Sequence, residues 1–167
     1  MNTTTDLVTL VPGYSTILNG PTEPIETITP DIIELANNML AFIRSRGGIG
    51  LAANQVGVSK SLIVIDLGAD EPPLMMVNPH ITAYSDEKQT LEEGCLSFPD
   101  VLIPVERSTQ VRVRYIDENG RPQANVYVGM TARVIQHEVD HLNGITLKSK
   151  VSRMKWEQAV RKTRKKR

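Results

Sequence analysis

The chain has 167 residues, 40% of them hydrophobic and 23% charged, with a formal net charge of zero. These values fit one compact globular domain over residues 1–167. No apolar run is long enough to span a membrane, the N-terminus lacks the pattern of a secretory signal, and the single cysteine, Cys95, excludes an intrachain disulfide. We therefore expect a protein of the cytoplasm without a membrane partner. We also expect it to be a monomer, although none of these features determines its oligomeric state.

The charges are unevenly distributed along the chain. Residues 148–167 carry ten Lys or Arg and one acid, Glu157, which leaves nine basic and eighteen acidic residues elsewhere. The C-terminus is thus a basic helix or tail on an acidic body. Two interpretations are open, a contact with a polyanionic partner and a solvated terminus.

In chain order, the first helix is expected to begin at Thr29-Pro30-Asp31, because a cap residue, a proline in the first turn and an early acid favour a helix start. Apolar residues then recur at helical spacing until Gly47-Gly48, where the helix should end. These residues form the expected core face: Ile32, Leu35, Ala36, Met39 and Ile43.

Strands are expected to follow. The apolar run at 61–67 is typical of a buried strand, and 74–79 should form another that Pro79 ends. Residues 111–117 alternate between apolar and mostly polar positions, which indicates a strand with one wetter face. A turn signal at 118–120 predicts that 124–128 returns antiparallel.

The next helix is expected from about Met130 to Asn143. Met130, Val134, His137 and His141 are separated by four, three and four residues, so they should share one helix face. Together with the strands before it, this helix predicts an α+β fold, in which antiparallel sheets pack around one central helix.

A last helix is expected from Ser152 to about Lys162. Met154 and residues 156–160 should face the body of the protein.

The strongest local motif is His137-Glu138-Val139-Asp140-His141, an H-E-x-x-H pattern on the central helix. Two imidazoles four residues apart can bind the same metal ion, and the glutamate between them can take a proton from a water. The alternative is a surface helix that happens to carry two histidines.

A catalytic metal site of this kind generally needs a third protein ligand. Cys95, His80 and Glu157 are the candidates. Cys95 would give a coherent site of one thiolate and two imidazoles, suited to Fe²⁺, Zn²⁺ or Ni²⁺. A lone cysteine is otherwise most often a buried packing residue, and His80 could be a turn residue.

The segment Gly48-Ile49-Gly50-Leu51-Ala52-Ala53-Asn54-Gln55 is a weaker signal. Its glycines could mark only a helix end and a tight turn. Alternatively, its small residues let a substrate backbone approach, and the Gln55 amide could donate to a developing oxyanion.

Together these segments resemble the peptide deformylase family. That family shows a G-hydrophobic-G-hydrophobic-A-A-x-Q segment, an E-G-C-x-S segment and a Q-H-E-x-D-H segment, in this order. They correspond here to GIGLAANQ at 48–55, EGCLS at 93–97 and QHEVDH at 136–141. The resemblance begins at 12–18, includes 63–66, 78–79 and 141–144, and spans nearly the whole chain.

The resemblance implies a metallohydrolase that removes the N-formyl group from the initiator methionine of nascent polypeptides and releases formate. It implies Cys95, His137 and His141 as ligands of one divalent ion, with Fe²⁺ expected first and Zn²⁺, Ni²⁺ or Co²⁺ as alternatives. It also implies Glu138 as general base and acid.

The resemblance further implies that Gln55 and the Leu96 backbone N–H donate to the oxyanion. Many bacterial members carry an arginine where this chain has Leu102, which puts one substrate contact in doubt. The family's second arginine corresponds to Arg107, for which we expect a structural role paired with Asp140.

For the methionine side chain we expect an apolar pocket. Its residues are Ile49, Leu91, Met130 and Val134. The peptide should lie extended near Gly50, in the manner of an added strand.

Two other functions remain open from the sequence. One is a zinc endopeptidase with Glu157 as the third ligand. The other is a non-enzymatic RNA-binding module in which the histidines hold a structural ion, although such ions normally have four protein ligands.

Overall fold

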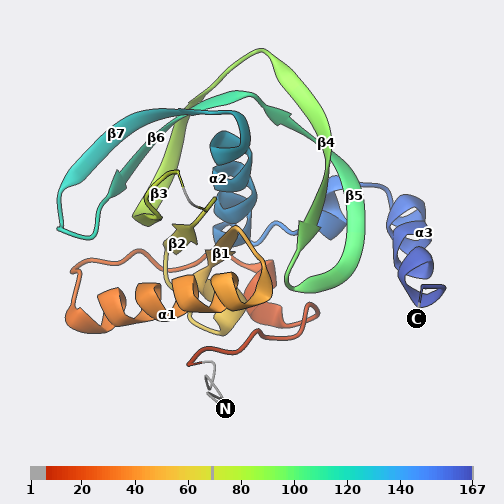
Figure 1. Ribbon diagram of the computed structural model, residues 1–167, viewed down its shortest axis with the longest axis horizontal. Coiled ribbons are helices and arrows are strands. Elements are labelled where there is room, and N and C mark those ends of the chain that lie inside the picture. The colour runs from red at the N-terminus through yellow and green to blue at the C-terminus, as the bar shows by residue number, and fades with distance from the viewer. Residues whose placement is uncertain (1–6, 69, 167) are drawn as a thin grey trace.

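The computed structural model describes residues 7–68 and 70–166. It is one compact α+β domain in which two antiparallel sheets surround a central helix (Figure 1). The three α-helices are α1 (Pro30–Arg46), α2 (Gly129–Leu142) and α3 (Arg153–Arg164). The strands are β1 (Gly50–Ala52), β2 (Leu62–Ile65), β3 (Leu74–Tyr84), β4 (Lys88–Cys95), β5 (Phe98–Ser108), β6 (Gln110–Ile116) and β7 (Pro122–Val128). Short 3-10 turns lie at Thr16–Asn19, Ala53–Val56 and Leu147–Lys150.

The helix α1 begins and ends as its sequence predicts. Pro30 is its first residue, and Gly47 ends it in the left-handed conformation, with φ 66° and its N–H donating to the Ile43 carbonyl. Met39 and Ile43 are fully buried and pack with the apolar side chains of β2 and β3. This packing fixes the position of the Gly48–Gly50 segment that follows α1.

The larger sheet has the strand order β1-β2-β3-β6-β7, and every pair in it is antiparallel. The expected hairpin of β6 and β7 is confirmed, with Val111 opposite Tyr127 and Val113 opposite Asn125. Val111, Val113 and Tyr115 are buried on one face, as their alternation predicts. Because β1 is at one edge of this sheet, one side of its backbone faces away from β2.

The expectation that Pro79 ends its strand is wrong. The strand β3 continues to Tyr84, and the register shifts between Val77 and His80. Asn78 adopts a positive φ of 51°, and its side chain exchanges hydrogen bonds of 2.8 and 2.7 Å with the backbone of Ile25. This irregularity lets the strand continue past a residue that cannot donate to the ladder. His80 therefore lies within a strand, opposite Arg114, and not in a turn.

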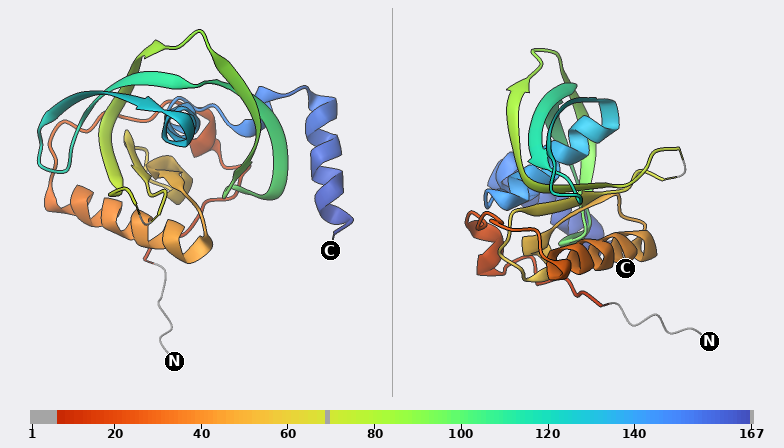
Figure 2. Two further views of the ribbon diagram at one scale, coloured as in Figure 1. Left: turned by 45° about the horizontal axis from the view of Figure 1, so that its top comes forward. Right: turned by 90° about the vertical axis from the view of Figure 1, so that its left-hand side faces the viewer.

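The strands β4 and β5 form a separate two-stranded sheet, and β5 is a strand that the sequence analysis did not predict. The two strands are joined by the two-residue turn Leu96-Ser97, so that Cys95 is opposite Phe98. The hairpin curves around one side of α2, as two views show (Figure 2).

The central helix α2 packs its apolar side chains against the larger sheet. Ala132, Ile135 and Leu142 are buried there together with apolar residues of β2, β3 and β6. After the helix, Gly144 has a φ of 73°, and a Cβ on it would lie 2.6 Å from the Gly20 backbone nitrogen. A side chain at position 144 would collide with this backbone, so only glycine fits where the chain leaves α2.

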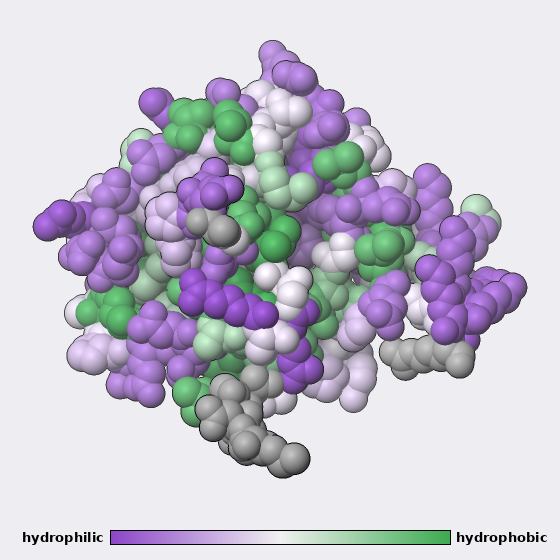
Figure 3. All heavy atoms as spheres, in the orientation of Figure 1, coloured by the Kyte–Doolittle hydropathy of each residue, from purple (hydrophilic) through white to green (hydrophobic). Residues whose placement is uncertain are grey.

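The helix α3 lies at one end of the molecule, against the hairpin (Figure 1). Trp156 is buried, and its ring meets Phe98 edge to face with the centroids 5.1 Å apart. The expectation that Met154 also faces the body is wrong, because 64% of it is exposed. Hydrophilic side chains dominate the α3 end of the face drawn in Figure 3.

Within the described residues, no helix combines the length and apolar character that crossing a bilayer requires.

Candidate metal centre and catalytic cleft

Three potential metal ligands meet between β4 and α2. Cys95 ends β4, while His137 and His141 lie one turn apart on α2, and one donor atom of each falls within 4.8 Å of the others. The Cys95 Sγ is 3.3 Å from the His141 Nε2. A thiolate with two imidazoles is a donor set that suits Fe²⁺, Zn²⁺ or Ni²⁺, so these residues fit a divalent ion.

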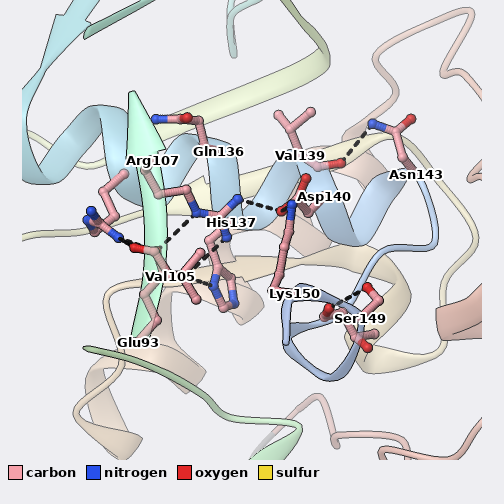
Figure 4. A network of polar contacts seen from close by, with 12 residues as sticks. Glu93, Val105, Arg107, Gln136, His137, Val139, Asp140, Asn143, Ser149 and Lys150 are labelled. Carbon is pink, nitrogen blue, oxygen red and sulfur yellow. Dashed lines mark hydrogen bonds and ion pairs between the residues drawn. The ribbon is translucent and has the colours of Figure 1, made fainter. Parts of the chain in front are cut away.

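Glu93 is a residue of this site for which the sequence suggested no role. It stands two positions before Cys95, and alternate residues of a strand point to the same face. Its carboxylate accepts hydrogen bonds from Arg107 Nε and Nη2, and its Oε2 lies 3.0 Å from the His137 Nδ1 (Figure 4). Because a carboxylate accepts, Nδ1 carries the hydrogen and the Nε2 lone pair of His137 is left for a metal.

The electrostatics keep Glu93 ionised. Its burial would raise its pKa, but hydrogen bonds from His137 and Arg107 outweigh burial and lower the pKa to about 2. The expected pair of Arg107 and Asp140 is present, with 2.5 Å between Nη1 and Oδ2, and Lys150 also binds this carboxylate over 2.9 Å. Arg107 thus connects β5 to α2 within a buried ionic network (Figure 4).

The two histidines have opposite tendencies toward protonation. Burial would lower the pKa of His137, but its contacts with Cys95 and Glu93 outweigh burial and raise the pKa to about 10. Burial lowers the pKa of His141 to about 3, and the charge of His137 adds to this effect. A divalent cation shared by the cluster would replace the proton of His137 and use the free lone pair of His141.

Glu138 is buried beside this cluster. Burial is the main cause that raises its pKa to about 7, and its Oε2 has no hydrogen-bond partner among the described residues. A Cβ on Gly50 would lie 2.7 Å from the Glu138 Oε1 and 2.6 Å from a methyl carbon of Val134. Because glycine has no side chain, position 50 leaves room for the Glu138 carboxylate.

Gln55 reaches the turn that carries Cys95. Its Oε1 accepts from the Ala52 backbone N–H over 2.9 Å, which turns its amide nitrogen toward Ser97 Oγ at 3.1 Å and Cys95 Sγ at 3.5 Å. Leu96 is the first residue of this turn, directly after Cys95. The structure therefore brings Gln55, Cys95 and Leu96 together.

Asn54 is a further buried residue at the site that the sequence analysis did not single out. Its side-chain nitrogen donates to the His141 backbone carbonyl over 2.6 Å. The bond ties the GIGLAANQ segment directly to the last turn of α2.

A cleft of about 610 Å³ opens onto these groups between α2, β1 and β4. All four residues expected to form the methionine pocket line it, namely Ile49, Leu91, Met130 and Val134. Val134 is buried, whereas 42% of Ile49 and 49% of Met130 are exposed. The cleft thus has apolar walls next to the cysteine–histidine cluster.

Known proteins resemble this chain over most of its length. The sequence profile of the polypeptide deformylase family matches residues 8–157. A peptide deformylase of Synechocystis sp. is 48% identical over 138 residues, which cover 81% of this chain and 74% of the relative. The chain belongs to the polypeptide deformylase family. A peptide deformylase of Rhizobium meliloti is 41% identical over 149 residues, covering 87% of this chain and 86% of the relative.

Solved deformylase structures have the same fold. A peptide deformylase from Synechococcus elongatus in complex with actinonin superposes with a TM-score of 0.89 at 41% identity, covering 95% of this chain and 87% of that one. A class I type b peptide deformylase from Acinetobacter baumannii with bound Met-Ala-Ser superposes with a TM-score of 0.81 at 35% identity, covering 86% of this chain and 98% of that one. The family and the α+β fold expected from the three motifs are confirmed.

Two further positions singled out in the sequence, Glu157 and Leu102, lie outside the cysteine–histidine cluster. Glu157, the third ligand of the endopeptidase alternative, lies on α3, where it pairs with Arg153 over 2.8 Å and is not part of the cluster. Leu102, where the family resemblance led us to expect an arginine, is 53% exposed, and its side chain lies over Gly94. Leu102 thus places an apolar side chain beside Gly94, a residue that lines the cleft.

Proposed function

We propose that Cys95, His137 and His141 hold one divalent metal ion with which this chain carries out the reaction of its family. That reaction is the hydrolytic removal of the N-formyl group from nascent polypeptides. The observation that carries the assignment is the convergence of three donor atoms within 4.8 Å in a cleft that also contains a buried glutamate. Fe²⁺ is the ion we propose first, with Zn²⁺, Ni²⁺ and Co²⁺ as alternatives. When bound, such an ion supplies Lewis-acid chemistry, polarising a carbonyl and lowering the pKa of a water.

Glu138 acts as the general base and then as the general acid. It accepts a proton from the water that attacks the formyl carbon, and it returns a proton to the amine nitrogen when the C–N bond breaks. Formate and a free amino terminus result. A pKa of about 7 suits both steps, because the group can gain or lose a proton near neutral pH.

Gln55 and the Leu96 backbone N–H donate to the oxygen that becomes negative during the attack. The orientation of the Gln55 amide nitrogen toward the Cys95 turn supports this role. One such donor contributes roughly 3 to 4 kcal/mol in other enzymes.

The methionine side chain enters the apolar part of the cleft, formed by Ile49, Leu91, Met130 and Val134. The peptide extends along the free edge of β1 near Gly50, where an added strand finds backbone donors and acceptors. The relative from Acinetobacter baumannii with Met-Ala-Ser bound supports the choice of a formylated form of this peptide as a probe.

We further propose that α3 and the residues after it contact ribosomes. The charge of residues 148–167, with ten Lys or Arg, supports a polyanionic partner. A thiolate ligand at Cys95 needs reducing surroundings, which favours the cytoplasm as the compartment.

The test uses purified protein prepared without oxygen and loaded with Fe²⁺ or Ni²⁺. We expect formate release from formyl-Met-Ala-Ser, and we expect Cys95→Ala to lose its metal on dialysis while Glu157→Ala keeps it. Stoichiometric metal in Cys95→Ala would refute the ligand set. Cleavage of an internal peptide bond would favour an endopeptidase, and absence of turnover would favour a binding module.

A further inference from the structure

Arg133 lies on α2 one turn before His137, so both side chains leave the same face of the helix. Its side chain is 7% exposed, and its Nη1 donates to the Glu93 Oε1 over 2.7 Å. The other oxygen of that carboxylate lies 3.0 Å from the His137 Nδ1. One carboxylate is thus held by two groups of the same helix.

The contact of Arg133 with Glu93 matters for the metal site because of where Glu93 lies. Glu93 belongs to β4, which also carries Cys95, whereas His137 belongs to α2. Because the thiolate and the imidazoles come from different elements, the distance between them depends on how β4 sits on α2. The Glu93 carboxylate links the two elements next to His137, in addition to the contact between Cys95 and His141.

Arg133 also binds the backbone of both hairpin strands. Its Nη1 donates to the Val105 carbonyl of β5 over 3.0 Å, and its Nη2 donates to the Gln89 carbonyl of β4. A planar guanidinium with several donors can hold three acceptors in a fixed arrangement. The hairpin is therefore attached to α2 at three atoms through one side chain.

Arg107 binds Glu93 as well, but it comes from the hairpin itself. It reaches α2 through Asp140, three residues after His137 (Figure 4). Arg133 attaches the hairpin four residues before His137. Gln136, one residue before His137, also joins α2 to the hairpin through the Ser108 backbone. Arg133 adds an attachment nearly one turn earlier on α2, and unlike Gln136 it binds Glu93 directly.

We propose that Arg133 is a positioning residue that fixes the β4–β5 hairpin on α2 and, through Glu93, sets the placement of His137 relative to Cys95. This inference rests on the proposed function, because it takes both residues as metal ligands. Arg133 also lines the cleft together with Leu91 and Val134, so the same attachment sets the width of the methionine pocket.

The experiment compares three variants of the zinc-loaded protein. Arg133→Met keeps an unbranched apolar stem but removes the guanidinium donors, and Arg133→Lys keeps the positive charge. Gln136→Met is the matched control. Gln136 is buried on the same helix and joins it to β5 by exchanging hydrogen bonds with the Ser108 backbone, without touching Glu93.

The zinc dissociation constant is measured by competition with a chelator, alongside KM, kcat and the thermal midpoint. We expect Arg133→Met to weaken zinc binding by about 10- to 100-fold, as is usual when the partner of a metal-ligand network is lost. KM for formyl-Met-Ala-Ser should rise. Arg133→Lys should recover part of both losses, and Gln136→Met should lower the thermal midpoint without changing zinc affinity.

Unchanged zinc affinity in Arg133→Met would overturn the proposal. An equal loss in Gln136→Met would also overturn it, since the effect would then be general destabilisation. Failure of the proposed function has a different signature, because Cys95→Ala would then bind zinc as tightly as the unmodified protein.

Discussion

At the scale of single residues, we propose that Glu138 takes part in catalysis without binding the metal. Its carboxylate is buried next to the cluster but is not one of the three grouped donors. We expect Glu138→Gln to keep its metal and to lose about 10²- to 10⁴-fold in kcat/KM, the usual effect of removing one acid–base group. Formate release and elemental analysis measure the two properties. Near-normal activity would remove Glu138 from the mechanism, and the exposed, paired Glu157→Gln serves as control.

Gly50 gives a second prediction at this scale. Its substitution by alanine places a Cβ 2.6 Å from Val134 and 2.7 Å from the Glu138 Oε1, which are distances that require the carboxylate to move. Gly50→Ala should therefore reduce kcat by at least about 10²-fold, the lower range for a lost general base, while the metal content stays stoichiometric. Gly20→Ala is the matched control, because a Cβ there meets nothing within 4 Å. Equal kcat in both variants would show that Glu138 tolerates the displacement.

The residues that we propose to bind the metal and to catalyse the reaction could be identified from the sequence, whereas the residues that contact and orient them could not. Spacing alone brings His137 and His141 to one helix face, and the motifs single out Cys95 and Gln55. Glu93 stands inside the EGCLS motif, but its contact with His137 depends on how β4 packs against α2. The role of Arg133 depends on the same tertiary contact, so local patterns could not reveal either residue.

At the scale of elements, the two misjudged strands both contain proline. The alternation of Val101, Ile103 and Val105 was a strand signal, but Pro99 and Pro104 argue against a strand. Each strand of a two-stranded sheet has one unpaired edge, toward which a proline nitrogen can point. In β3 the missing N–H of proline is accommodated differently. The register shift between Val77 and His80 leaves Pro79 without a strand partner to which it would have to donate a hydrogen bond. Neither compensation can be recognised before the pairing is known.

Asn78 provides a stability prediction for β3. Asn78→Ala loses both hydrogen bonds with Ile25 and leaves a residue with a Cβ at a φ of 51°. The expected cost in the free energy of unfolding is about 2 to 4 kcal/mol from two lost bonds and backbone strain. Asn78→Gly separates the two causes, because it loses the bonds but tolerates the positive φ. Urea denaturation measures both, and equal midpoints for Asn78→Ala and the unmodified protein would contradict the assigned role.

At the scale of the whole molecule, the central helix and antiparallel sheets were predictable, but the order of the strands was not. Neighbours in sequence would be expected to pair, yet β3 pairs with β6, and the β4–β5 hairpin between them leaves the sheet. This arrangement places Cys95 on one element and the histidines on another. The site therefore exists only when the hairpin has docked on α2, which is a global property of the fold.

The basic C-terminus is the last feature at this scale. Trp156 packs on Phe98, and Val160 adjoins the same apolar cluster, so the helix must be kept to that point. Residues 161–167 carry six of the ten Lys and Arg of the C-terminal segment, whereas the proposed catalytic groups all lie before residue 142.

We expect a protein that ends at Val160 to hydrolyse short formyl peptides normally but to bind ribosomes more weakly at low salt. Binding by the full chain should fall steeply as salt rises, because each phosphate contact releases a counterion. A full-length variant with the six Lys and Arg of 161–167 changed to Gln keeps the chain length and should behave like the truncation. Cosedimentation with ribosomes measures the effect. Equal cosedimentation of all three proteins would mean that these charges serve only to solvate the terminus.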